Sequence, residues 1–329
     1  MVKMTIEDLL TSEVPEDTKK MIRSLNKDAQ ELLIQMASKG SDYDRYIRVE
    51  NVLKKYVLDT SMNQELYHYT SITNLKKILH SKQWLIKRYN YMNDPSEMKW
   101  ALKMANIMLV QNEDIQLIKS FNDMFRANPF NDLYIWSFSL NNHNQALFGN
   151  YSHGEDGIAI KFKAQEVQNT LATTYAHGKQ DPNKFQFGDS FVGACKVEYD
   201  IDIQKKYISK IVDFWVTAYK NRSKDQYDMN EIMKRCMITL VFLSMIFKNP
   251  YLSQEEEIRF LVINKNSDAS VHADKIIDGI PYMKTKLNNK LIKEIINKTG
   301  NNITTSEITK IINEMGFSEI DVTSSDLPY

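Results

Sequence analysis

Acidic and basic side chains alternate in one stretch of the chain, in the pattern Glu255-x-Glu257-x-Arg259. Side chains alternate between the two faces of a strand, so a strand over 255–263 places these three on one face and Ile258 on the other. Two carboxylates on one face repel each other, burial raises the pKa of at least one, and Arg259 offsets their charge. The pattern is typical either of acid–base chemistry or of a solvated strand edge with ordinary charges.

Two other short segments present polar side chains in the same way. A strand through Ser137 and Ser139 puts both on one face, and a strand through His68 and Thr70 does the same. Three polar-faced strands predict a sheet that presents a cleft to a polar ligand. The simpler interpretation of His68 is a core histidine that donates to a backbone carbonyl, and the serines can be merely small strand residues.

The elements that position these residues are short strands separated by helices of mixed length. This order predicts an α+β fold rather than the regular alternation of a doubly wound sheet. Residues 1–62 read as a helical N-terminal extension, a cap or an oligomerisation element, before a domain over 63–329. We expect strands at 66–70, 84–86, 135–140, 157–162, 192–199 and 255–263, and helices near 204–222, 229–247, 288–296 and 306–315.

Composition excludes several classes of protein. Lys and Arg number 42, as do Asp and Glu, and the zero net charge disfavours bulk electrostatic binding of nucleic acid. Two cysteines without a CxxC pair suit a reducing cytoplasm, and the first ten residues predict no signal peptide. The most apolar window, 232–247, is too short to span a bilayer, so we expect no membrane association. The sequence lacks the Rossmann, P-loop, HExxH and GxSxG motifs, and its scattered histidines predict no metal site.

Taken in order, six short motifs resemble a large bacterial family known only as a domain of unknown function. The resemblance covers about residues 64–329, with Phe148 standing where the family pattern leads us to expect Trp. The motifs are Leu66-Tyr-His-Tyr-Thr-Ser71, Asn93-Asp-Pro-x-Glu97, Ser137-Phe-Ser139, Phe148-x-x-Tyr151 before Gly157-Ile, Glu255-x-Glu257-x-Arg259, and Ser325-x-x-Pro-Tyr329.

That family in turn resembles the ADP-ribosyltransferase superfamily, which implies a split mixed or antiparallel sheet surrounded by helices, and NAD as substrate without a metal. Breaking the nicotinamide–ribose bond develops positive charge on the sugar, as in glycoside hydrolysis. By the resemblance, Glu257 stabilises that cation and Glu255 orients or deprotonates the acceptor. His68 holds the adenosine-side ribose.

The resemblance implies supporting roles for the other polar residues. Thr70 lies near His68, Ser137 and Ser139 brace the strand that carries Glu257, and Tyr151 stacks on nicotinamide. The remaining residues on the NAD side are Tyr69, Arg259, Asn93 and Asp94.

The expected function is therefore that of a cytoplasmic ADP-ribosyltransferase-like protein, and family context suggests a toxin or phage-defence effector. Its acceptor is an unidentified protein or nucleic acid. Two alternatives stay open: a non-catalytic module that binds a nucleotide or partner, and an NAD glycohydrolase with water as acceptor.

Overall fold

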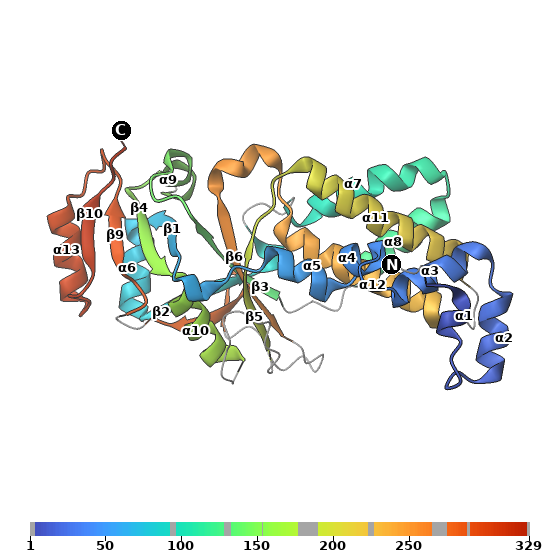
Figure 1. Ribbon diagram of the computed structural model, residues 1–329. Helices are drawn as coiled ribbons and strands as arrows, with labels where there is room; N and C mark the ends of the chain where they lie inside the picture. The colour runs from blue at the N-terminus through green and yellow to red at the C-terminus, as the bar shows by residue number, and fades with distance from the viewer. Residues whose placement is uncertain are drawn as a thin grey trace. The chain divides into compact units, whose positions relative to one another are not determined.

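The computed structural model describes residues 4–92, 97–127, 133–152, 154–176, 190–222, 227–264, 275–287 and 290–327 (Figure 1). The chain forms two compact units. The helical unit comprises Met1–Tyr56, Ser96–Pro129 and Glu198–Pro250, and the sheet unit comprises Val57–Pro95, Phe130–Val197 and Tyr251–Tyr329. These bounds differ from the expected division after residue 62, because the first helices join two later stretches of the chain.

In the helical unit, the first turns of several helices are capped by short polar side chains. Asn26, Ser41, Asp114 and Asp200 each accept a hydrogen bond from a backbone amide at the start of a helix. In the described chain, no helix is both long and apolar enough to span a membrane. The elements are α1 (Ile6–Leu9), α2 (Glu16–Ser24), α3 (Lys27–Ala37), α4 (Asp42–Tyr46), α5 (Val49–Tyr56), η3 (Glu97–Lys99), α7 (Trp100–Leu109), η4 (Val110–Asn112), α8 (Ile115–Arg126), α11 (Ile201–Lys220) and α12 (Tyr227–Ile246).

The sheet unit alternates short strands with helices, as the sequence predicts. Ser71 caps α6 by accepting from the backbone amide of Asn74. The elements are η1 (Thr60–Met62), β1 (Glu65–Ser71), α6 (Ile72–Ser81), β2 (Gln83–Arg88), η2 (Tyr89–Tyr91), β3 (Leu133–Ser139), α9 (Gln145–Ser152), β4 (Gly157–Lys163), α10 (Ala164–Tyr175), β5 (Ser190–Lys196), η5 (Pro250–Glu255), β6 (Glu257–Asn264), β7 (Lys275–Ile277), β8 (Ile280–Lys286), β9 (Glu294–Asn297), α13 (Thr305–Glu314) and β10 (Asp321–Ser324).

The strands form one mixed open sheet, so the protein is α+β (Figure 1). Eight strands follow the order β10-β9-β4-β1-β3-β2-β8-β7, while β6 pairs with β3 and β5. The β9–β10 pair is parallel, and the other pairs are antiparallel. Strand β3 therefore contacts three strands, which a strand with two edges can do only if two of them share one edge.

The sheet forks at β3. One edge of β3 pairs with β6 along its whole length, from Leu133 to Ser139. Within the described strands, β1 meets the other edge at Ser139 alone, and β2 meets it at Tyr134 and Ile135. Between those two points β1 and β2 diverge, and at this fork no described strand pairs with the middle of that β3 edge.

The two faces of the sheet differ in chemistry. One, the aromatic face, is packed against α6, α10 and α13 and belongs to the larger apolar core. The other, the carboxylate face, is covered in part by α9, whose Leu147 and Phe148 pack on Tyr67, Tyr69 and Ala159. The aromatic face is defined by Trp84, Trp136, Phe138, Phe162 and Phe260, and the carboxylate face by Tyr67, Ser137, Ser139, Glu257 and Arg259.

Two predicted elements are wrong. Over its described part, residues 290–296, the expected helix at 288–296 is instead a turn leading into β9 (Glu294–Asn297). Leu291, Ile292, Ile295 and Ile296 recur with helical spacing, but Ile295 and Ile296 are buried on opposite faces of the sheet, which hides the strand period. The strand expected from residue 255 begins at Glu257, because residues 250–255 form a 3₁₀ helix.

Candidate functional site

A row of polar side chains crosses three neighbouring strands on the carboxylate face. Tyr67 of β1 lies opposite Ser139 of β3, which lies opposite Glu257 of β6. Residues directly opposite on antiparallel strands point to the same side, so these three side chains are neighbours. One step along, Ser137 lies opposite Arg259. The structure thus brings together four of the predicted site residues: Ser137, Ser139, Glu257 and Arg259.

Glu257 and Arg259 form a bidentate ion pair. Arg259 donates from Nε to Oε1 of Glu257 over 2.8 Å and from Nη2 to Oε2 over 3.0 Å. The arginine is 1% exposed and the glutamate 6%. A guanidinium fork matches a carboxylate in shape, and this geometry offsets the high cost of removing both charges from water. Arg259 therefore fixes the orientation of the Glu257 carboxylate.

The two serines beside this pair have different surroundings. Ser139 is buried, and its Oγ accepts from the backbone amide of Asn141 over 3.0 Å, which holds the chain as it leaves β3. The Oγ of Ser137 is buried without a hydrogen-bond partner among the described residues. Unsatisfied buried hydroxyls are uncommon in folded proteins. The Ser137 hydroxyl thus has spare hydrogen-bonding capacity on this face.

Glu255 does not share a strand face with Glu257, which corrects the expected arrangement. It ends η5, and Glu256 follows with a φ of 44°, in the left-handed region, before β6 begins. This turn removes Glu255 from the period-two alternation of the strand. Glu255 is nevertheless buried, and the turn is held by Asn144 Nδ2 donating to the carbonyl of Gln254.

His68 lies at the fork and points to the aromatic face. Its neighbour Tyr67 points to the carboxylate face, so alternation places His68 and Glu257 on opposite sides of the sheet. His68 Nδ1 lies 2.9 Å from the carbonyl oxygen of Ser137, on the β3 edge that the fork leaves open. Its ring packs edge-on against Trp84 at 4.9 Å between centroids. Burial lowers the pKa of His68 from 6.5 to about 4, so the ring is neutral and Nδ1–H donates.

These contacts match the simpler interpretation, a core histidine that satisfies a backbone carbonyl. The contact with a ribose remains a prediction. Thr70 shares the aromatic face with His68, is buried, and accepts from Asn74 Nδ2 over 3.2 Å.

Tyr69 and Tyr151 lie on the carboxylate face, in the apolar cluster beneath α9. The hydroxyl of Tyr69 donates to the carbonyl of Asn141 over 2.6 Å and accepts from the amide of Asn144 over 3.0 Å. Burial raises the pKa of Tyr69. Tyr151 is on α9 and packs against the same cluster, half-buried. Both rings therefore pack within the protein, and stacking of Tyr151 on a ligand remains a prediction.

Asn93 and Asp94 lie outside the described residues. Glu97, from the same motif, begins η3 in the helical unit, where its Oε1 lies 2.9 Å from Nζ of the buried Lys248. No group of three or more His, Cys, Asp or Glu side chains in the described ranges could hold a metal ion.

The polar row continues across residues that sequence reasoning missed. Tyr67 donates to Oε2 of Glu65 over 3.0 Å, and Lys161 of β4 lies 2.8 Å from Glu65 and 3.3 Å from Glu294 of β9. The hydrogen bond from Lys161 lowers the pKa of Glu65, and burial raises the pKa of Tyr67 to about 12. The alternation of polar and apolar residues along the two strands could have identified them. Glu65 and Tyr67 flank the apolar Leu66, and Lys161 lies between Ile160 and Phe162.

Comparison with known proteins finds one family match, and that match covers part of this site. Residues 147–260 match the family described as "Protein of unknown function (DUF2971)". The match extends from α9 to Phe260 and includes Tyr151, Glu257 and Arg259, whereas His68 and the two serines precede it. No curated protein and no solved structure matched the chain. These comparisons therefore find a DUF2971 domain of unknown function over about a third of the sequence.

Proposed function

We propose that the sheet unit is an ADP-ribosyltransferase-like domain that acts on NAD. The observation that carries the proposal is the buried carboxylate of Glu257, held by Arg259 on the central part of a forked sheet and lined by Ser137 and Ser139. A fixed carboxylate in a poorly hydrated site stabilises positive charge that develops on a substrate far better than one in water.

The chemistry requires little movement of protons at Glu257. The C–N bond between nicotinamide and ribose breaks, its electron pair leaves with nicotinamide, and the sugar becomes an oxocarbenium-like cation. Arg259 donates two hydrogen bonds to the Glu257 carboxylate and keeps it in place. In that position the carboxylate would face the cation and accept from a ribose hydroxyl.

The acceptor then bonds to the anomeric carbon and gives up a proton to a base. Glu255, buried in the turn before β6, is our candidate for that base. If water is the acceptor, the same site is an NAD glycohydrolase. His68, on the other face, would have to reach the adenosine-side ribose through the fork.

Incubation with NAD labelled in its adenylate part tests the proposal. We expect release of nicotinamide, which Glu257→Gln abolishes, because the amide carries no negative charge. Glu256→Gln is the matched control, since it makes the same change one residue away in an exposed side chain. Label attached to protein or nucleic acid indicates transfer, and free ADP-ribose indicates hydrolysis. Absence of nicotinamide release from the folded wild-type protein would refute both.

The bidentate pair itself favours a second candidate, a non-catalytic nucleotide-binding module. Both oxygens of Glu257 are bonded to Arg259, as in an ion pair that serves structure alone. This candidate predicts saturable binding of NAD with no release of nicotinamide, and equal affinity in the wild type and in a folded Glu257→Gln variant. Calorimetry on the same proteins separates it from the enzyme hypothesis.

A further inference from the structure

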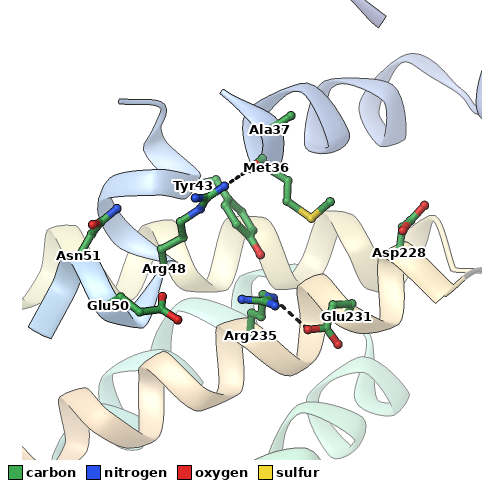
Figure 2. A pocket seen from close by; sticks show the side chains of 9 residues that line it. All are labelled: Met36, Ala37, Tyr43, Arg48, Glu50, Asn51, Asp228, Glu231 and Arg235. Carbon is green, nitrogen blue, oxygen red and sulfur yellow. Dashed lines mark hydrogen bonds and ion pairs between the residues drawn. The ribbon is translucent and has the colours of Figure 1, made fainter. Parts of the chain in front are cut away.

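The helical unit contains a pocket of about 650 Å³. It lies between the end of α3, the helices α4 and α5, and the first half of α12 (Figure 2). Its floor includes the aromatic ring of Tyr43, and its rim carries charged side chains from α5 and α12. All of these elements belong to one compact unit.

Two arginines at this pocket are already held by the protein. Arg48 donates from Nη2 to the carbonyl of Met36 over 2.7 Å, and its Nε lies 3.4 Å from Asp44. Arg235 donates from Nε to Glu231 over 2.9 Å, and the dashed line in Figure 2 marks this bond. The Nη groups of Arg235 remain available, because that side chain is 44% exposed.

Two carboxylates at the pocket have no such partner. Neither Glu50 nor Asp228 makes an ion pair or a side-chain hydrogen bond in the described structure, and Figure 2 shows them on opposite sides of Tyr43. Each lies in the first turn of a helix, where the helix dipole favours an acid. The helix dipole explains why an acidic residue stands at each position, but it provides no ion-pair partner. Both carboxylates can therefore still bind a cation.

Tyr43 supplies an independent indication of a ligand. The residue is 1% exposed, and its hydroxyl has no hydrogen-bond partner among the residues described. In Figure 2 the hydroxyl points toward Arg235. Burial raises the pKa of Tyr43, so the hydroxyl keeps its proton. The hydroxyl and the guanidinium can both donate, so an anionic oxygen that entered between them would satisfy both.

We propose that this pocket binds a free basic amino acid such as lysine. Its carboxylate would lie between Tyr43 and Arg235, and its two cationic groups would face Glu50 and Asp228. Two arginines and three carboxylates line the pocket, which leaves one negative charge for a ligand of net charge +1 to neutralise. This inference is independent of the function proposed for the sheet unit.

Calorimetric titration with three ligands of almost equal length tests the assignment. Lysine carries all three groups, norleucine lacks the side-chain cation, and cadaverine lacks the carboxylate. We expect saturable binding of lysine, and at least about tenfold weaker binding of each of the other two, because each loses a charged hydrogen bond. Equal affinity for lysine and cadaverine, or no saturable lysine binding, would overturn the proposal.

Three variants locate the ligand groups. Tyr43→Phe should weaken lysine about tenfold and leave cadaverine unchanged, since only lysine has a carboxylate for the hydroxyl. It should fold at least as stably as the wild type, because it removes an unsatisfied hydroxyl. Glu50→Gln and Asp228→Asn should each weaken lysine, whereas Asp17→Asn, a fully exposed control on α2, should not. Unchanged lysine affinity in folded Tyr43→Phe protein would refute the placement.

Discussion

The neutral histidine at the fork makes stability depend on pH in a defined window. The pKa of His68 is about 4 in the folded protein, where the ring is buried, and 6.5 in the unfolded chain, where it is not. Between these values the unfolded chain binds a proton that the folded chain does not, so stability falls as pH falls from 6.5 to 4. At about 1.4 kcal/mol per pKa unit, the loss amounts to about 3 kcal/mol below pH 4 relative to neutral pH.

The measurement is urea denaturation of the wild type and of His68→Asn at several pH values between 7 and 4. Asparagine is the matched variant, since its Nδ2 occupies nearly the position of Nδ1 and can donate to the Ser137 carbonyl without titrating. Near-ultraviolet circular dichroism follows the packing of the aromatic side chains, which include Trp84 stacked on Trp136 beside His68. Other groups titrate in both proteins, so their difference isolates His68. Parallel pH curves for the two proteins would refute the assignment.

Three further substitutions test the packing of the sheet unit. Arg259→Met should cost about 3–5 kcal/mol of unfolding free energy, because it leaves the Glu257 carboxylate buried without the Arg259 guanidinium. Adding Glu257→Leu should recover most of that loss, whereas additive losses in the double variant would contradict the pairing. Thr304 caps α13 in a capping box, in which its side chain accepts from the amide of Glu307 and the Glu307 side chain accepts from the amide of Thr304. Thr304→Ala should therefore cost about 1 kcal/mol of unfolding free energy, whereas the control Ser318→Ala, at an exposed position, should cost almost nothing. Equal losses in the two variants would contradict this cap. Phe162→Ala should lower the free energy of unfolding, measured by thermal denaturation, by about 3–5 kcal/mol, because the ring is fully buried in the aromatic face. A loss under about 1 kcal/mol would contradict this, since it would mean that neighbouring side chains fill the cavity.

Local pattern was enough to predict elements in which one face is plainly apolar. The strand Gly157-Ile-Ala-Ile-Lys-Phe162 alternates without interruption and forms β4 as expected. The two long helices after residue 200 were likewise predicted to within a few residues. The stretch before β9 could not be resolved in this way, because Ile295 and Ile296 are both buried and the chain shows no alternation there.

The site could be predicted only where side chains alternate between the two faces of a regular strand. Alternation correctly placed Ser139 and Ser137 on one face and Glu257 with Arg259 on one face, and pairing of β3 with β6 makes these one cluster. It failed at Glu255, because nothing in three successive glutamates marks the positive φ at Glu256. The fork at β3 depends on which strands become neighbours, a property of the whole chain that no short window contains.

The division of each unit among three stretches of chain governs the order in which the protein can fold during synthesis. The helical unit lacks α11 and α12 until the chain passes residue 246, and the sheet lacks β6, the partner of both β3 and β5, until it passes residue 264. Strands β1 to β5 are therefore synthesised before β6, the strand that joins β3 to β5. Until β6 is made, the apolar aromatic face of these strands is incomplete. Contacts between such distant segments slow folding and prolong the exposure of unpaired edges. A fragment that ends before β6 would leave the edges of β3 and β5 open to pairing with other chains, and so would be prone to aggregate.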